Sequence, residues 1–195
     1  MKILLSADFH SEFKRLYEYV GIVDLCICCG DIFDYHRFPQ KRFEFPLPFY
    51  SIKGNKELWG GGRLLDRLES FENFFWLNQH LRELEELTDI RFFGIDYVHS
   101  TKKIPNNVEI LITHMPAYGL ADQCSDTYHA TMAPNCGSKH VRRLVDKIEP
   151  LFVIAGHVHY YQTEKVGKTT AITLAQALNE PVLIIEGKNI VSINN

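Results

Sequence analysis

Short apolar segments that each end on a polar side chain recur along this chain, and they constrain its fold more than any other feature. In an α/β protein, the loops at the carboxyl ends of parallel strands converge on one edge of the sheet, where ligands bind. The polar residues that follow these segments are therefore expected to lie together. The segments are ILLSAD, LCICCGD, FYSIKGN, ILITH and LFVIAGH.

Seven side chains at or just beyond the ends of these segments are candidate metal ligands. They offer carboxylate, imidazole and amide donors but no thiolate, a set that suits Mn, Fe, Zn or Co, with Mn as our first expectation. Two divalent ions about 3.5 to 4 Å apart would need a bridging carboxylate, with the water between them deprotonated to hydroxide. The seven residues are Asp8, His10, Asp31, Asn55, His114, His157 and His159.

The hydrophobic pattern predicts alternating strands and helices up to His159, and a different pattern after it. Helices are expected near 11 to 20, 63 to 70 and 138 to 148, the last with Ser138 as its N-cap. Residues 81 to 94 fit a helix followed by a strand and a hairpin equally well. The segments after His159 suggest a meander. The strands are expected near 2 to 7, 22 to 29, 49 to 53, 72 to 77, 90 to 95, 108 to 113 and 151 to 155.

The length and charge of the chain limit its partners. Its 195 residues are expected to form one domain, 1 to 195. A formal net charge of -3 argues against a surface built to grip long nucleic acid, and leaves a small phosphorylated substrate open. No apolar run approaches the roughly 18 residues of a membrane span, so no membrane partner is expected. A cytoplasmic location is the simplest setting.

The five cysteines do not suggest a metal site. Strand alternation places Cys26 and Cys28 on one face and Cys29 on the other, so the three are expected to be buried core thiols. Cys124 and Cys136 could pair, although a reducing compartment is the simpler assumption.

The order of the motifs DFH, GDIFD, GNKE, ITH and GHVH, over residues 8 to 159, resembles that of the calcineurin-like metallophosphoesterase superfamily. The resemblance implies a four-layer α/β/β/α sandwich of two mixed sheets. It also implies that Asp31 bridges two metals. One metal would be held by Asp8, His10, Asp31 and His159, and the other by Asp31, Asn55, His114 and His157.

One position departs from the family pattern, which usually reads GNH where this chain has GNK. The family histidine is thought to protonate the leaving oxygen, whereas Lys56 occupies its place here. Imidazoles titrate near pH 6.5 and suit this task better than lysines, which titrate near 10.4. Lys56 could act as an electrostatic clamp paired with Asp34, or His36 or His129 could supply the acid. In the third alternative, catalysis is largely lost.

Two segments are candidates for substrate recognition. Residues 33 to 50 interleave aromatic residues with Arg37, Lys41 and Arg42, which could stack a nucleobase and hold its phosphate. The alternative for this segment is a loop packed on its own domain or at a homodimer interface. The other candidate is the basic start of the helix after Ser138.

The sequence thus predicts a phosphoesterase with a binuclear metal centre. It would hydrolyse a small phosphodiester or nucleotide by in-line attack of a metal-bridging hydroxide. The alternative is a weakly active or inactive metal-binding interaction module of the same fold. An exposed apolar patch between Phe38 and Phe49 would favour that alternative.

Overall fold

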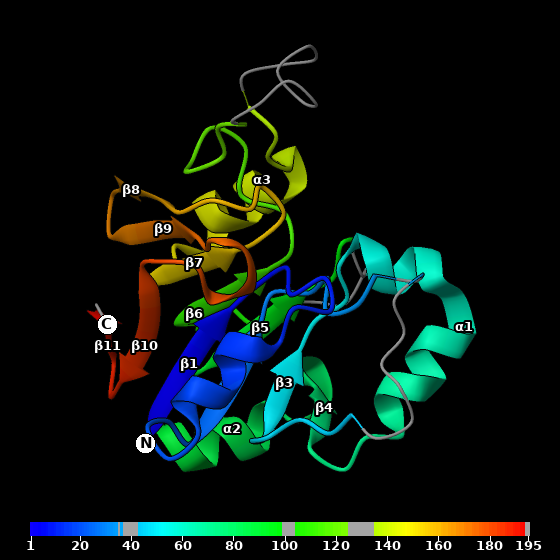
Figure 1. Cartoon of the computed structure of the whole chain (residues 1–195). Helices are drawn as coiled ribbons and strands as arrows, with labels where there is room; N and C mark the ends of the chain where they lie inside the picture. Colours follow the sequence, from blue (N-terminus) through cyan, green and yellow to red (C-terminus); the bar gives the residue numbers. More distant parts are fainter. Residues whose placement is uncertain (35, 37–42, 99–103, 125–134, 194–195) are drawn as a thin grey trace.

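The chain forms two β-sheets that pack face to face, with helices on both outer sides (Figure 1). A computed structural model describes residues 1–34, 36, 43–98, 104–124 and 135–193. Within these residues, every helix is too short or too polar to span a bilayer.

The first sheet has six strands in the order β11-β10-β1-β2-β3-β4. Strands β1 to β4 run parallel, because the chain crosses over between them, whereas β10 and β11 are antiparallel additions at the β1 edge. The sheet is therefore mixed. Its strands are β1 (Lys2–Ser6), β2 (Leu25–Cys28), β3 (Phe49–Ser51), β4 (Phe74–Trp76), β10 (Val182–Glu186) and β11 (Asn189–Ile193).

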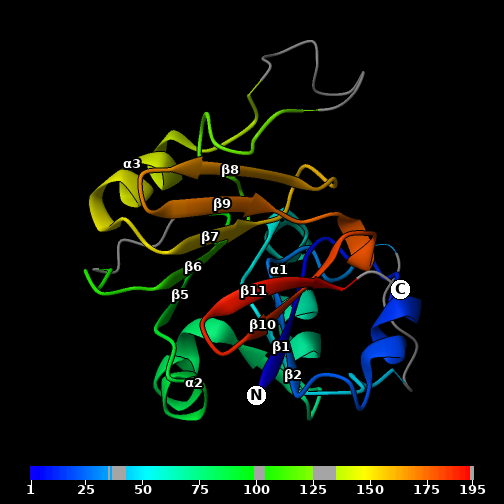
Figure 2. The ribbon, with the colours of Figure 1, turned by 90° about the vertical axis from the view of Figure 1, so that its left-hand side faces the viewer.

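The second sheet has five strands in the order β5-β6-β7-β9-β8. Strands β5, β6, β7 and β9 run parallel, and β8 pairs with β9 in the antiparallel direction. Figure 2 shows this sheet lying against the first one. Its strands are β5 (Phe92–Ile95), β6 (Ile110–Thr113), β7 (Phe152–Ala155), β8 (Gln162–Val166) and β9 (Thr169–Thr173).

Three apolar cores separate four layers. The middle core lies between the sheets, where Leu5 and Ile27 of the first sheet belong to the same cluster as Ile112 and Ile154 of the second. One outer core joins the first sheet to α1 and the short helix η1, and the other joins the second sheet to α3. This is the α/β/β/α arrangement that the resemblance implied. The helices are α1 (Asn55–Glu69), α2 (Leu81–Thr88), α3 (Lys139–Ile148) and the 3-10 helices η1 (Lys14–Tyr19), η2 (Leu77–Gln79) and η3 (Gln176–Leu178).

The predicted elements are mostly present, with three differences and one open alternative resolved. Each strand predicted between residues 2 and 155 exists, and Ser138 caps α3 by accepting a hydrogen bond from the backbone N–H of Val141 at 3.3 Å. The helix expected near 11 to 20 is a 3-10 helix, and α1 begins eight residues before the predicted start. Residues 81 to 95 form a helix and then a strand. The expected meander is instead two hairpins, one in each sheet.

The cysteines divide into two groups. Cys26 and Cys28 are buried in the core outside the first sheet, and Cys29 in the core between the sheets, which confirms the predicted alternation. Cys124 and Cys136 are joined in a disulfide, a pairing that the sequence left open.

The aromatic segment at residues 33 to 50 is packed against its own domain where it is described. Phe33, Phe45 and Phe49 are buried in the outer core of the first sheet, with Phe43 packed against it. The three cations of this segment lie outside the described residues. Among the aromatic side chains of this segment that the structure describes, only Phe43 is partly exposed.

Candidate metal centre

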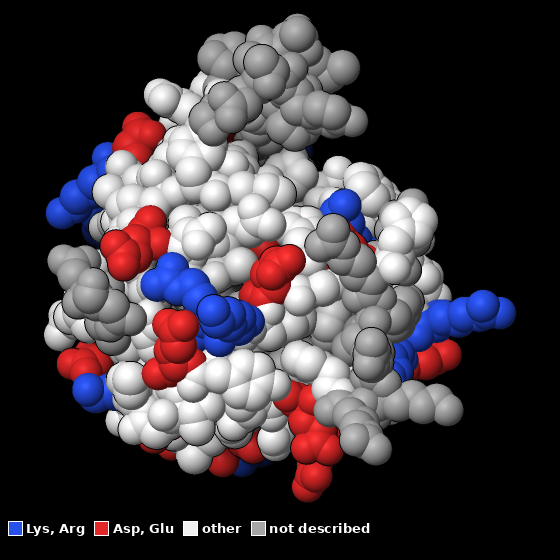
Figure 3. Space-filling view, in the orientation of Figure 1, with Lys and Arg blue, Asp and Glu red and all other residues white. Residues whose placement is uncertain are grey.

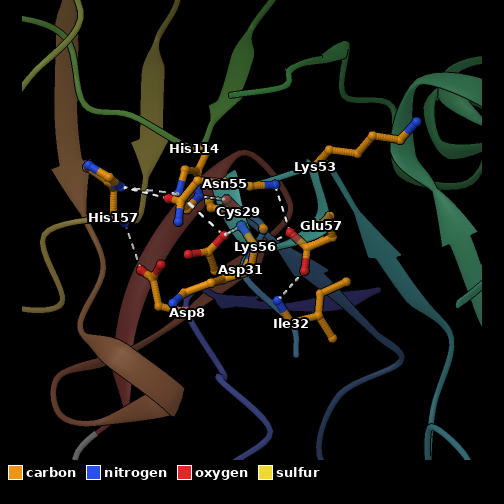
Figure 4. A network of polar contacts seen from close by, with 12 residues as sticks. Asp8, Cys29, Asp31, Ile32, Lys53, Asn55, Lys56, Glu57, His114 and His157 are labelled. Carbon is orange, nitrogen blue, oxygen red and sulfur yellow. Dashed lines mark hydrogen bonds and ion pairs between the residues drawn. The ribbon is translucent and has the colours of Figure 1, made fainter. Parts of the chain in front are cut away.

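The seven predicted ligands come together where strands of both sheets end. Four of them follow strands β1, β2 and β3 of the first sheet, and three follow β6 and β7 of the second. The expectation of a single sheet edge is thus corrected, because the centre lies where the edges of two packed sheets meet. Figure 4 shows Asp8, Asp31, Asn55, His114 and His157 turned toward one another.

One group of ligand atoms gathers around His10. Its Nε2 lies 3.1 Å from Nε2 of His159 and 3.9 Å from Oδ2 of Asp31. Nε2 of His159 in turn lies 3.8 Å from Oδ1 of Asp8. Asp8, His10 and His159 can therefore present one atom each to a common ion.

A second group gathers around Asn55. Its Oδ1 lies 2.8 Å from Nε2 of His114 and 3.2 Å from Nδ1 of His157. Asp31 lies beside this group as well, since its Oδ1 is 3.7 Å from Nε2 of His114. The two carboxylate oxygens of Asp31 thus face different groups, which is what a bridging ligand requires.

The hydrogen bonds behind two imidazoles fix which nitrogen faces the centre. Nδ1 of His114 lies 2.8 Å from the carbonyl oxygen of Cys29, which can only accept, so Nδ1 carries the proton. Nδ1 of His10 likewise donates to the carboxylate of Asp34 at 2.9 Å. The Nε2 atoms of both rings then face the centre, and such support behind a ligand is typical of metal sites.

The ligand atoms fit a bound cation. Nε2 of His114 and Oδ1 of Asn55 both present lone pairs 2.8 Å apart, an arrangement that repels unless a positive charge lies beside both. Two atoms bonded to one ion at about 2.1 Å lie about 3 Å apart when the bonds are perpendicular. Among the buried side-chain polar atoms that the structure describes, only Oδ1 of Asp8 lacks a hydrogen-bond partner. A cation would satisfy it.

The protonation of these groups follows from their burial. Burial and the charge of Asp31 raise the pKa of Asp8 well above its usual value. Burial lowers the pKa of His114 to about 4, and burial together with His10 lowers the pKa of His159 to about 4. Both imidazoles are therefore neutral at pH 7, the form that binds metals.

Five of the seven candidate ligands hold a left-handed backbone. Their φ angles lie between 45° and 74°, a region that costs a residue with a Cβ about 1 to 2 kcal/mol. Strain of this kind persists where the surrounding structure enforces it, and it clusters at functional sites. The five residues are Asp8, His10, Asp31, His157 and His159.

Lys56 lies at the rim of the centre. Its backbone N–H donates to Oδ1 of Asp31 at 2.8 Å, and its Nζ lies 3.6 Å from Oδ1 of Asp34. Although partial burial opposes the effect, the hydrogen bond from His10 and the charge of Lys56 lower the pKa of Asp34. The predicted pairing of Asp34 with Lys56 is thus present. Of the alternative acids, His36 lies exposed in a turn and His129 falls outside the described residues.

Glu57 is the residue that sequence reasoning missed. Its fully buried carboxylate accepts hydrogen bonds from the backbone N–H groups of Asp31, Ile32 and Gly54, at 2.9, 2.7 and 2.8 Å. Burial and the charge of Asp31 raise its pKa to about 7. Glu57 therefore ties the loop after β2 to the start of α1, and so positions Asp31 against Asn55. The GNKE motif was the only sequence signal for it.

Comparison with known proteins finds a sequence relative and structures of the same fold. The UPF0046 protein K07C11.7 of Caenorhabditis elegans is 36% identical over 211 residues, which cover 90% of this chain and 70% of that protein. A dimetal phosphatase from Danio rerio shares the fold, with a TM-score of 0.60, 12% identity and coverage of 99% of this chain and 98% of that one. GAP50, the anchor in the inner membrane complex of Plasmodium, has a TM-score of 0.57 at 12% identity, covering 98% and 83%.

The model of one protein family matches most of the sequence. It covers residues 1–161 and is described as calcineurin-like phosphoesterase. This span contains all seven candidate ligands as well as Asp34, Lys56 and Glu57. The chain therefore belongs to the calcineurin-like phosphoesterase family.

Proposed function

We propose that this protein is a two-metal phosphoesterase that hydrolyses a small phosphodiester or a nucleotide. The observation that carries the proposal is the pair of ligand groups that share Asp31, next to the unpartnered buried oxygen of Asp8. Mn²⁺ is the first candidate for the metal because the donors are carboxylate, imidazole and amide.

Each residue of the centre has a task in this proposal. Two divalent cations would supply a water nucleophile at neutral pH and positive charge for the phosphoryl oxygens. The ligands hold these ions, and the left-handed loops fix the ligand positions before substrate arrives. Lys56, kept in place by Asp34, adds a positive charge at the rim and holds a phosphoryl oxygen. The proposal gives Lys56 no proton to deliver, so substrates with good leaving groups are favoured.

The surface supports a small substrate. On the face shown in Figure 3, Lys and Arg side chains are interspersed with Asp and Glu, and the described residues on this face form no continuous basic strip. Long nucleic acid is usually held by such a strip. A phosphodiester is preferred over a monoester, and the relative rates on the two test this preference.

The rival proposal is a metal-binding interaction module. It draws support from Lys56 in the place of the family histidine, and from the description of GAP50, a protein of the same fold, as an anchor. Against it, Phe45, Leu47 and Phe49 are buried, so the described part of the segment that would form an apolar patch does not expose one.

Hydrolysis of bis(p-nitrophenyl) phosphate by the protein supplied with Mn²⁺ tests the proposal, with p-nitrophenyl phosphate assayed beside it. We expect faster turnover of the diester, and a loss of at least about 100-fold in Asp31→Ala because the shared ligand is removed. Asp66→Ala, which changes an exposed carboxylate on α1, is the matched control and should keep full activity. Two bound metals without turnover would favour the interaction module.

A further inference from the structure

Trp59 is a large aromatic side chain exposed beside the candidate centre. It follows Asn55 by four residues in α1, so both lie on the same side of the helix, about one turn of 5.4 Å apart. Asn55 points into the centre, yet 65% of Trp59 is exposed to solvent. The indole ring is therefore exposed to solvent on the helix face that carries Asn55, one helical turn away.

Lys56 connects this ring to the centre. Its Nζ lies 5.8 Å from the centroid of the Trp59 ring and 3.6 Å from Oδ1 of Asp34. Asp34 in turn holds the candidate ligand His10. A positive charge able to hold a phosphoryl oxygen thus lies near both an exposed aromatic ring and the carboxylate that supports a candidate ligand.

The backbone presents Trp59 in this position through a break in α1. Gly61 has a φ of 66° and a ψ of -165°, so the helix is interrupted two residues after Trp59. A Cβ at Gly61 or Gly62 would meet no atom within 4 Å, so packing does not demand glycine at either position. Gly61 instead supplies the backbone turn. This turn separates Asn55–Gly60, the short helical segment that carries Asn55, Lys56 and Trp59, from the rest of α1.

A single exposed aromatic residue is ordinary on a protein surface. Trp59 differs because its ring contacts a cation that also contacts the support of a metal ligand. Aromatic rings beside a positive charge are the common means of holding a nucleotide, since the ring stacks on the base while the charge holds the phosphate.

We propose that Trp59 is a specificity-determining residue that stacks on an aromatic ring carried by the phosphate ester, while Lys56 holds a phosphoryl oxygen. The substrate class is then a nucleotide or nucleoside phosphodiester. This inference rests on the proposed function and deepens it, and it moves the stacking role from the 33 to 50 segment to α1.

Binding of adenosine 5′-monophosphate and of ribose 5-phosphate to the protein supplied with Mn²⁺, measured by calorimetry, tests the inference. The two ligands differ only in the base, so the ratio of their dissociation constants isolates stacking. We expect the nucleotide to bind about 5- to 30-fold more tightly, the ratio that a moderate stacking contact produces. In Trp59→Leu this ratio should fall below about twofold, whereas Trp59→Phe should keep most of it. Tyr17→Leu, which removes an exposed aromatic on η1, should leave it unchanged.

The inference is overturned if the two ligands bind the parent protein equally well, or if the advantage of the nucleotide survives in Trp59→Leu. Its failure is distinguishable from failure of the proposed function. Hydrolysis of bis(p-nitrophenyl) phosphate without a base-dependent ratio removes the stacking role alone. A ratio that depends on Trp59 in a protein with no hydrolysis supports the stacking role and contradicts the enzyme.

Discussion

At the scale of single residues, Lys56 is the side chain that would decide which esters the proposed enzyme can cleave. Its ammonium group is paired with Asp34 at 3.6 Å, and Asp34 also accepts a hydrogen bond from His10. An ammonium group can stabilise charge on the phosphoryl group, but lysine is by nature a poorer acid than histidine for protonating a leaving oxygen. The chemistry is then limited by the stability of the departing group.

Replacing Lys56 with histidine should therefore help most where the leaving group is poor. We expect Lys56→His to raise turnover of alkyl phosphodiesters by about 10- to 100-fold, because an imidazole can donate a proton at neutral pH. Turnover of p-nitrophenyl esters should change by less than about threefold. Turnover is measured on a series of diesters whose leaving groups differ in pKa. It should depend less steeply on that pKa in the variant than in the parent protein. Lys56→Gln is the control, and it should slow every ester. An equal gain across the series would contradict the missing-acid explanation.

The convergence of the candidate ligands could be predicted from the sequence because each follows an apolar strand by one to four residues. Glu57 could not, since its role depends on three backbone N–H groups that only the folded loops bring together. The left-handed backbone conformation of Asp8 and Asp31 could not be predicted either, because aspartate does not require it.

At the scale of elements, the break in α1 sets the geometry of the rim. The conformation of Gly61 belongs to a region that is essentially reserved for glycine. Gly62, its neighbour in the same helix, has open space around it and no left-handed φ. The two glycines therefore form a matched pair for testing whether the break is required.

We expect Gly61→Ala to lower the free energy of unfolding by about 1 to 3 kcal/mol, because the added Cβ is strained at this φ. Gly62→Ala should be neutral or stabilise by up to about 1 kcal/mol, since alanine favours the helix. Chemical denaturation of both variants provides the measurement. Equal effects at the two positions would show that the break has no conformational requirement for glycine.

The buried strands were predicted well, because each appears in the sequence as a continuous apolar run. The start of α1 was missed because three consecutive glycines oppose a helix, and here they mark its interruption. The two C-terminal hairpins look alike in sequence, yet β8 pairs with β9 in the second sheet while β10 pairs with β1 in the first. Partners so distant along the chain leave no local signal.

At the scale of the whole molecule, an ion-pair cluster joins the two sheets at the edge opposite the metal centre. Lys188, in the turn between β10 and β11, lies 3.0 Å from Oε1 of Glu109, which precedes β6. It also lies 3.5 Å from Asp89 at the end of α2. Although partial burial opposes the effect, hydrogen bonds from Arg91 and Lys188 lower the pKa of Glu109.

Because the pKa of Glu109 is lowered on folding, its stabilising contribution exists above the ordinary value of 4.5 and disappears as pH falls through the folded value. We expect Glu109→Gln to lower the free energy of unfolding by up to about 1 kcal/mol at pH 7. The parent and the variant should become equally stable in acid, below the folded pKa. Denaturation across this pH range measures the difference. A double-mutant cycle with Lys188→Gln isolates the pair, and a coupling of zero would assign the effect to Arg91.

Neither ligand group of the candidate centre is complete within one sheet. Asp8, His10 and Asp31 follow strands of the first sheet and need His159 from the second, whereas Asn55 needs His114 and His157. A chain whose sheets have not yet docked can offer only a fragment of either group, and so retains an ion poorly. Metal uptake by the proposed centre would therefore require that the sheets have docked, because each ligand group is complete only once folding has brought both halves of the protein together.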